Sequence, residues 1–259
     1  MSDRVSLDVA SLSHPGMVRT HNEDSVFVDG EAGLAVLADG MGGYSAGEVA
    51  SGIAVNVIST GMLQELNSGR ELSKVDIASG LTHAALLLQQ QIALANKGIY
   101  EAAQQRPECA GMGTTLVATV FFQNRVSIGH IGDSRCYRLR ADRFEQLTHD
   151  HSLLQEQIDS GMLTRIEAVV PADIAEYRVE AEDVYVLCSD GLTDMVDAEV
   201  VREIVAAKRS DLAEAAAELI DVANQNGGRD NVSVVVIRVP AEFLPTGGWL
   251  QRWMTKKPA

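Results

Sequence analysis

The stretch AVLADGMGG, residues 35–43, leads an apolar segment directly into an aspartate followed by glycines. Asp-Gly is a common turn dipeptide, so one copy does not separate a turn residue from a carboxylate that does chemistry. Two later stretches repeat the arrangement. VSIGHIGDS, residues 126–134, places Asp133 after an apolar run, and VYVLCSDG, residues 184–191, does the same for Asp190. Three predicted strands therefore end in an aspartate.

The sequence that follows each aspartate separates these three sites. A hairpin turn is followed promptly by a second alternating strand, but Gly40 and Gly191 are each followed by sequence with helical spacing. This weakens the interpretation of Asp39 and Asp190 as turn residues. For Asp133 that interpretation remains reasonable, because another strand-like segment follows directly.

Further acidic residues stand just before predicted strands: Glu23 and Asp24 near the N-terminus, and Asp230 before the last strand. If these strand ends converge, several carboxylates share one cleft. Two such charges about 4 Å apart repel by about 1 kcal/mol in water and about 4 kcal/mol at an effective dielectric of 20. The cluster would then need cations or raised pKa values. Each aspartate taken singly is more often a cap or turn residue.

The residue types in this set indicate the kind of cation. Oxygen ligands without His or Cys favour magnesium or manganese over zinc, and two such ions can present hydroxide to an electrophile such as phosphorus. The pattern therefore points to metal-assisted hydrolysis of a phosphoester. Arg19, four residues before Glu23, is suited to grip phosphate oxygens with its bidentate guanidinium. A lone arginine more often forms a surface salt bridge, so the neighbouring motifs are what favour the phosphate role.

Composition excludes some classes of partner. The 259 residues include 21 basic and 36 acidic side chains, for a net charge of −15, which disfavours binding to nucleic acid or to an anionic membrane. The first residues lack a basic leader with an apolar core, and no uninterrupted apolar run approaches the roughly 20 residues that span a bilayer. We therefore expect a cytoplasmic protein without membrane insertion. The three cysteines are far apart in the sequence and are predicted to be buried, reduced thiols.

Apolar periodicity predicts runs of strands and runs of helices rather than regular alternation of the two. The predicted strands are residues 5–12, 25–28, 33–38, 116–122, 125–131, 136–140, 144–147, 184–188 and 231–239. The predicted helices are residues 46–66, 73–105 with Ser73 and Asp76 as a capping pair, 153–160, 198–207 and 211–226. The residues around Pro171 are predicted to be irregular. This order indicates an α+β fold with antiparallel sheets covered by amphipathic helices.

Seven stretches of the chain, taken in order, resemble the bacterial branch of the metal-dependent (PPM, type 2C) serine/threonine protein phosphatases. They are GMVRTHNEDS, LADGMGGYSAGEVAS, GMGTTLV, IGDSRCYRL, LTHDHS, CSDGLTD and GGRDNVSVVVI. Any one of these motifs is weak evidence, but seven in order are strong. The resemblance extends over about residues 6–239.

The resemblance implies a four-layer αββα sandwich in which two central antiparallel β-sheets are flanked by α-helices. It places metals in a cleft at one edge of the sandwich. Residues 1–244 are predicted to form a single domain of this family, with a shortened flap region at about residues 151–183. Residues 245–259 are predicted to be a C-terminal tail.

The resemblance also implies roles for the acidic residues around Mn²⁺ or Mg²⁺. Asp39 would bridge two ions and the Gly40 carbonyl would bind one of them. Asp190 and Asp230 would hold the other ion. The nucleophile would be a water or hydroxide bridging the two ions, which attacks phosphorus without a phosphoenzyme.

Further residues complete this implied site. Glu23 or Asp24 would act mostly through coordinated water, and Arg19 would bind the substrate phosphate. Bacterial members often carry a third metal, for which the matching ligands are Asp133 and Asp190.

The residue after the bridging Asp-Gly departs from some eukaryotic relatives. They carry a histidine there, proposed as the general acid, whereas this chain has Met41, as is usual in bacterial relatives. Methionine cannot donate a proton, so a metal-bound water is the candidate donor to the leaving group. His149 and His151 are alternatives of little weight, because a polar loop histidine is usually structural or exposed.

A second departure lies between LTHDHS and VYVLCSDG. Relatives usually carry there a His-Pro pair and a stretch with Asn, Thr and Gly, whereas this chain has the shorter RIEAVVPADIAEYRVEAED, residues 165–183. Substrate selection, third-metal affinity and one strand pairing are the properties that this change puts in question.

The resemblance predicts an enzyme that hydrolyses phosphoserine and phosphothreonine in proteins, opposing a bacterial serine/threonine kinase. Two alternatives stay open: a non-catalytic regulator that binds phosphoproteins or a kinase, and a phosphomonoesterase of small molecules. The expected oligomeric state is a monomer.

Overall fold

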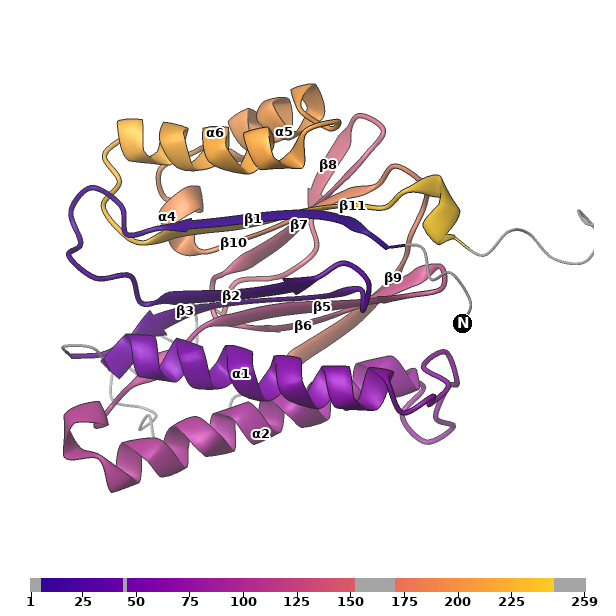
Figure 1. Ribbon diagram of the computed structural model, residues 1–259, viewed down its shortest axis with the longest axis horizontal. Coiled ribbons are helices and arrows are strands. Elements are labelled where there is room, and N and C mark those ends of the chain that lie inside the picture. The colour runs from indigo at the N-terminus through magenta and orange to yellow at the C-terminus, as the bar shows by residue number, and fades with distance from the viewer. Residues whose placement is uncertain (1–5, 44–45, 152–170, 245–259) are drawn as a thin grey trace, which may run out of the picture.

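The computed structural model describes residues 6–43, 46–151 and 171–244. They form four layers, with two β-sheets in the middle, one pair of helices below and another pair above (Figure 1). This is the α+β sandwich that the sequence predicts.

The upper sheet has five antiparallel strands in the order β1-β11-β10-β7-β8. Their bounds are β1 Asp8–His14, β11 Val232–Arg238, β10 Val184–Cys188, β7 Arg135–Arg140 and β8 Arg143–Gln146. Three elements lie on or beside it, α4 Asp190–Thr193, α5 Ala198–Ala207 and α6 Leu212–Gln225. A short 3₁₀ turn, η2 Ala241–Phe243, follows β11.

The lower sheet has six antiparallel strands. Five follow the order β2-β3-β5-β6-β9, and the short β4 pairs with the last two residues of β3, after the part of β3 that pairs with β5. Their bounds are β2 Asp24–Asp29, β3 Leu34–Met41, β5 Leu116–Phe122, β6 Arg125–Ile131, β9 Asp173–Arg178 and β4 Gly113–Thr114. The outer face is covered by α1 Ala46–Leu66 and α2 His83–Gln105, and α2 ends at the 3₁₀ turn η1 Pro107–Cys109.

Burial on both faces explains the continuous apolar runs in the central strands. In β3, Val36 packs toward α1 and α2, whereas Ala35 and Leu37 pack between the two sheets. Because side chains alternate along a strand, Asp39 follows on the side that faces the other sheet. The apolar run before Asp39 therefore places this carboxylate at the edge of the inter-sheet layer.

Two tight loops join neighbouring strands, and the prediction for the cysteines is confirmed. The two-residue loop Gln123–Asn124 joins β5 to β6, and Gln123 has a positive φ of 52°. The β7–β8 hairpin turns at Ala141, where φ is 51°. All three cysteines are buried and unpaired, as predicted.

The start of the second helix was predicted ten residues too early. The helix begins at His83, because the Thr82 hydroxyl caps it by accepting a hydrogen bond from the Ala85 amide at 3.3 Å. Thr82 is fixed in turn by Glu176 of β9, whose Oε1 accepts a hydrogen bond from the Thr82 hydroxyl at 2.6 Å. Ile77, which lies within the predicted helix over residues 73–105, is fully exposed in the connection that precedes α2.

Strand β9 was missed by the sequence prediction. Its residues alternate poorly in polarity and none is fully buried, so they lack the apolar pattern of an inner strand. The strand forms by pairing with β6 from Arg178 to Asp173. The predicted helix over residues 153–160, much of the flap region and the predicted tail lie outside the described residues.

The helix α1 is long and apolar but belongs to the core. Its 21 residues have the length and apolar composition of a membrane span. Half of its apolar 18-residue stretch is buried in the fold, where α1 packs against β3 and α2. The helix is apolar because it is a core helix of the sandwich.

Candidate metal centre

The centre begins with two carboxylates on neighbouring strands. Asp24 of β2 and Asp39 of β3 are directly opposite in the strand register, and Asp24 is buried. Asp39 therefore lies inside β3 rather than at its end, since the strand continues through Gly40 and Met41. Burial, followed by the negative charges of Asp24 and Asp190, raises the pKa of Asp39 far above its ordinary range.

The upper sheet supplies two more carboxylates from the neighbouring strands β10 and β11. Asp190 is the first residue of α4, directly after β10, and Asp230 lies just before β11. Figure 1 shows α4 and the α6–β11 connection at the same end of the sandwich as the β1–β2 loop. Burial, followed by the charge of Asp133, raises the pKa of Asp190. The buried hydroxyl of Ser189 joins the two sheets by donating to Asp24 Oδ2 at 3.0 Å.

Glu23 is held against the N-terminus of α1. The Gly47 amide donates a hydrogen bond to its carboxylate, and burial raises its pKa. A Cβ at Gly40 would lie 2.1 Å from the Gly47 carbonyl oxygen, and a Cβ at Gly47 would lie 2.7 Å from the Glu23 carboxylate. These contacts allow no side chain at either glycine, which gives Gly40 a packing reason independent of any metal.

Arg19 lies at the exposed side of the centre. Its Nη2 is 2.7 Å from Asp230 Oδ2, and the two side chains are 55% and 39% exposed. The predicted phosphate-binding residue and a predicted metal ligand thus form an ion pair with each other. A surface pair of this kind contributes little stability, so the guanidinium is free to exchange partners.

Asp133 approaches from the lower sheet, where it follows β6. Although Asp133 is exposed, desolvation, followed by the charges of Asp150 and Asp194, raises its pKa. Asp194 also raises the pKa of Asp190. Sequence analysis missed Asp194, and its position in CSDGLTD, four residues after Asp190, was the available signal.

Backbone contacts connect Asp39 to the Asp133 turn. The Thr114 hydroxyl and the Thr115 amide both donate to the Asp39 carbonyl at 2.8 Å. The Thr115 hydroxyl lies 2.7 Å from that of Ser134. The motif GMGTTLV therefore fixes the backbone beneath the centre.

Asn231 was also missed by sequence analysis, although it directly follows Asp230. Its Oδ1 accepts a hydrogen bond from the Glu23 amide at 2.7 Å, and its Nδ2 donates to the carbonyls of Pro15 and His21 at 3.0 and 2.8 Å. The residue is 5% exposed. Asn231 therefore fixes the loop that carries Arg19 and Glu23.

The site has the polarity and unmet hydrogen bonds of a cation site. Within the described part of the chain, three buried carboxylate oxygens of this site have no hydrogen-bond partner: Glu23 Oε1, Asp24 Oδ1 and Asp190 Oδ1. Buried, unpaired carboxylates are costly unless a cation or a proton neutralises them. All the donors are oxygens, which suits Mg²⁺ or Mn²⁺. The residues present therefore fit the ions that the sequence predicts.

The residues considered in connection with the general acid lie outside this group of carboxylates. Met41 is 39% exposed at the end of β3. His149 is exposed, and His151 is paired with Asp173.

The sequence profile of the protein phosphatase 2C family matches residues 17–231, which contain this whole centre. The chain belongs to the protein phosphatase 2C family. Over 249 residues it is 37% identical to the serine/threonine protein phosphatase PstP of Mycobacterium tuberculosis, covering 90% of this chain and 45% of PstP. Over 242 residues it is 36% identical to the serine/threonine phosphatase stp of Listeria innocua, covering 86% of this chain and 92% of stp. The chain thus spans about half the length of PstP.

A solved structure supports the same placement in the protein phosphatase 2C family. The catalytic domain of PstP in complex with two manganese ions is 36% identical to this chain and superposes with a TM-score of 0.75. The match covers 91% of this chain and 99% of that domain.

Proposed function

We propose that this chain is a Mn²⁺- or Mg²⁺-dependent phosphatase that hydrolyses phosphoserine and phosphothreonine in proteins. The observation that carries the proposal is the convergence of Asp24, Asp39, Asp190 and Asp230 on one centre, where the pKa values of the first three are raised and one oxygen each of Asp24 and Asp190 is unpartnered. Its membership of the protein phosphatase 2C family and the manganese-containing PstP structure support this reading.

The side chains that would hold the ions differ in position. Asp39 lies between the carboxylates of the two sheets, so it is suited to bridge two ions, with the Gly40 carbonyl beside it. Asp190 and Asp230 would hold the second ion, and Glu23 or Asp24 would act through water. A third ion would use Asp133 and Asp190. When bound, the ions supply Lewis-acid charge and lower the pKa of a water molecule, which is the chemistry that phosphoester hydrolysis requires.

Arg19 would bind and orient the substrate. Its guanidinium is exposed and forms an ion pair with Asp230. An incoming phosphate offers several charged oxygens in place of that one carboxylate, and a guanidinium binds phosphate in a bidentate manner. Met41 has no proton to give, so the leaving alkoxide would take its proton from water.

The proposal extends to the biological setting of the protein. Substrate phosphoproteins follow from the names of the relatives. A cognate serine/threonine kinase, a signalling role, a cytoplasmic location, a monomeric state and the absence of nucleic-acid partners follow from the family resemblance and the net charge of −15.

The test is phosphate release from a phosphothreonine peptide with added Mn²⁺. The wild type should be active in Mn²⁺ and inactive in EDTA. Asp190→Asn should lower kcat on the order of a hundredfold or more, because it removes one ligand charge. Asp221→Asn, on the exposed surface of α6, is the matched control and should keep wild-type activity.

Three outcomes would replace the proposal. Full turnover in excess EDTA would exclude the metal-dependent reaction. Tight phosphopeptide binding with no metal-dependent phosphate release would identify a non-catalytic regulator. Faster turnover of sugar phosphates and nucleotides than of phosphopeptides would identify a small-molecule phosphomonoesterase.

A further inference from the structure

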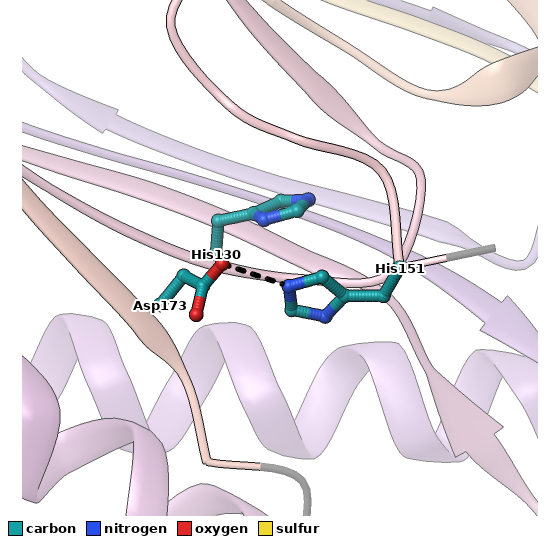
Figure 2. A group of neighbouring side chains, drawn as sticks. All are labelled: His130, His151 and Asp173. Atoms are coloured by element: carbon teal, nitrogen blue, oxygen red, sulfur yellow. Dashed lines mark hydrogen bonds and ion pairs between the residues drawn. The ribbon is translucent and has the colours of Figure 1, made fainter. Parts of the chain in front are cut away.

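A second group of ligating side chains lies on the lower sheet, beside the carboxylate centre. His130 of β6 and Asp173 of β9 are directly opposite in the strand register, and His151 meets both (Figure 2). His151 Nε2 is 3.1 Å from Asp173 Oδ2. One potential ligand atom of each residue lies within 4.8 Å of those of the other two.

His130 carries the strongest indication that this group binds something. Its side chain is buried, with the residue only 2% exposed, and among the described residues neither ring nitrogen has a partner at ordinary hydrogen-bond geometry. Its ring centroid lies 4.6 Å from that of His151, a contact that satisfies neither nitrogen. Buried polar groups normally have partners, and each missing partner costs about 1–3 kcal/mol. Burial lowers the pKa of His130 to about 4, so the ring is neutral at pH 7, the form that ligates metals.

The group is distinct from the carboxylate centre. Val117 pairs with both Leu37 of β3 and His130 of β6, so His130 lies level with Leu37, two residues inside Asp39. Two strand spacings separate β3 from β6, which places the group roughly 10 Å away along the sheet. Its donors also differ, because two are imidazoles.

We propose that His130, His151 and Asp173 form a zinc-binding site separate from the carboxylate centre. Two imidazoles and one carboxylate are a common protein ligand set for Zn²⁺, with water as the fourth ligand. Zinc–ligand bonds of 2.0–2.1 Å in a tetrahedron place neighbouring ligand atoms about 3.3 Å apart. This is close to the 3.1 Å between His151 Nε2 and Asp173 Oδ2. The Asp173 side chain is 66% exposed, which gives the ion a route from solvent.

Zinc binding would affect the turn that carries Asp133. The Gly132 amide donates to His151 Nδ1 at 3.3 Å, so His151 carries its proton on Nε2 and donates it to Asp173. Coordination at Nε2 would move that proton to Nδ1, where it opposes the Gly132 amide proton. Gly132 directly precedes Asp133. The zinc site is therefore coupled to the backbone at the edge of the carboxylate centre.

The test measures bound Zn²⁺ per chain by equilibrium dialysis at pH 7.5 in excess Mg²⁺, which occupies oxygen-only sites and binds imidazole poorly. The wild type should retain one more Zn²⁺ per chain than Asp173→Asn or His151→Gln. Asp173 is largely exposed, so Asp173→Asn should keep the fold, and an unchanged melting temperature would verify this.

The matched control is His149→Gln, which removes an exposed histidine two residues before His151. It should retain the wild-type amount of Zn²⁺. Any Zn²⁺ that enters the carboxylate centre is common to all four proteins and cancels in the comparison. Equal Zn²⁺ content in all four, or no Zn²⁺ on the wild type, would overturn the proposal without bearing on the proposed phosphatase activity.

Discussion

Asp39 lies where burial and like charges act together, and its raised pKa has a consequence for stability. Folding moves this carboxyl from an ordinary pKa of 3.8 to a higher one, so the unfolded state loses its proton first as pH rises. Without metal, Asp39 therefore destabilises the fold increasingly above pH 3.8.

We expect Asp39→Asn to separate stability from activity. In EDTA at pH 7.5 the variant should melt several degrees above the wild type, because an amide folds without the proton uptake that burial and repulsion by neighbouring carboxylates impose on Asp39 at this pH. The difference should shrink at pH 5, and Mn²⁺-dependent activity should be lost. Differential scanning calorimetry measures the first effect. A variant that melts below the wild type in EDTA would show that the repulsion is absent.

Asn231 supports the centre without being a predicted ligand. Asn231→Ala would leave the Glu23 amide and the Pro15 and His21 carbonyls without partners. We expect a loss of about 2–4 kcal/mol in the free energy of unfolding and a fall in kcat/KM. The control is Asn226→Ala, which removes one exposed hydrogen bond to Met195. Equal effects of the two substitutions in urea titrations would contradict this role.

The contrast between these residues shows what a sequence can predict at a site. Asp39 and Asp190 were found because each follows an apolar run in a recurring motif, and Asp230 was found because it stands just before the last predicted strand. Asn231 has no such mark, since its three partners lie more than 200 residues away in the sequence. His130 likewise looks like one more strand residue until β9 brings Asp173 opposite it.

At the scale of elements, apolar runs buried on both faces were the reliable signal. Strands β3, β5, β10 and β11 were predicted for this reason, whereas the arrangement in two central sheets was implied by the family resemblance. Strand β9 is partly exposed, and its place depends on β6. The start of α2 depends on the bonds of Thr82 to Glu176, a residue of β9. Both errors thus involve β9, because its pairing with β6 and the bonds of its Glu176 to Thr82 are long-range contacts that local periodicity does not contain.

The connection before α2 gives a prediction at this scale. Ile77→Ala should leave the free energy of unfolding unchanged, because Ile77 is fully exposed. Ile92→Ala, inside α2, should cost about 2–4 kcal/mol, because Ile92 is 3% exposed in the core. Urea unfolding of both variants compares them directly. Similar losses would mean that residues 73–82 belong to the helix, as the spacing alone predicts.

For the whole molecule, the net negative charge and the carboxylate centre both make the stability of the folded state depend on cations. The chain carries a net charge of −15, and several of its carboxylates are gathered between the two sheets. Cations that bind there stabilise the folded state by mass action, by about 2.7 kcal/mol per site at a concentration one hundred times Kd. General screening by salt also relieves repulsion, so specific and non-specific effects must be separated.

We therefore expect Mn²⁺ to raise the melting temperature of the wild type well above that in NaCl of the same ionic strength. The rise should continue with the logarithm of Mn²⁺ concentration, because binding adds RT ln(1 + [L]/Kd) to the free energy of unfolding. Asp190→Asn should lose a large part of this rise, since one ligand of the centre is neutral. Asp221→Asn makes the same change in net charge on the exposed surface of α6 and should retain it. A wild type that melts equally in Mn²⁺ and in matched NaCl would show that its carboxylates repel one another without holding an ion.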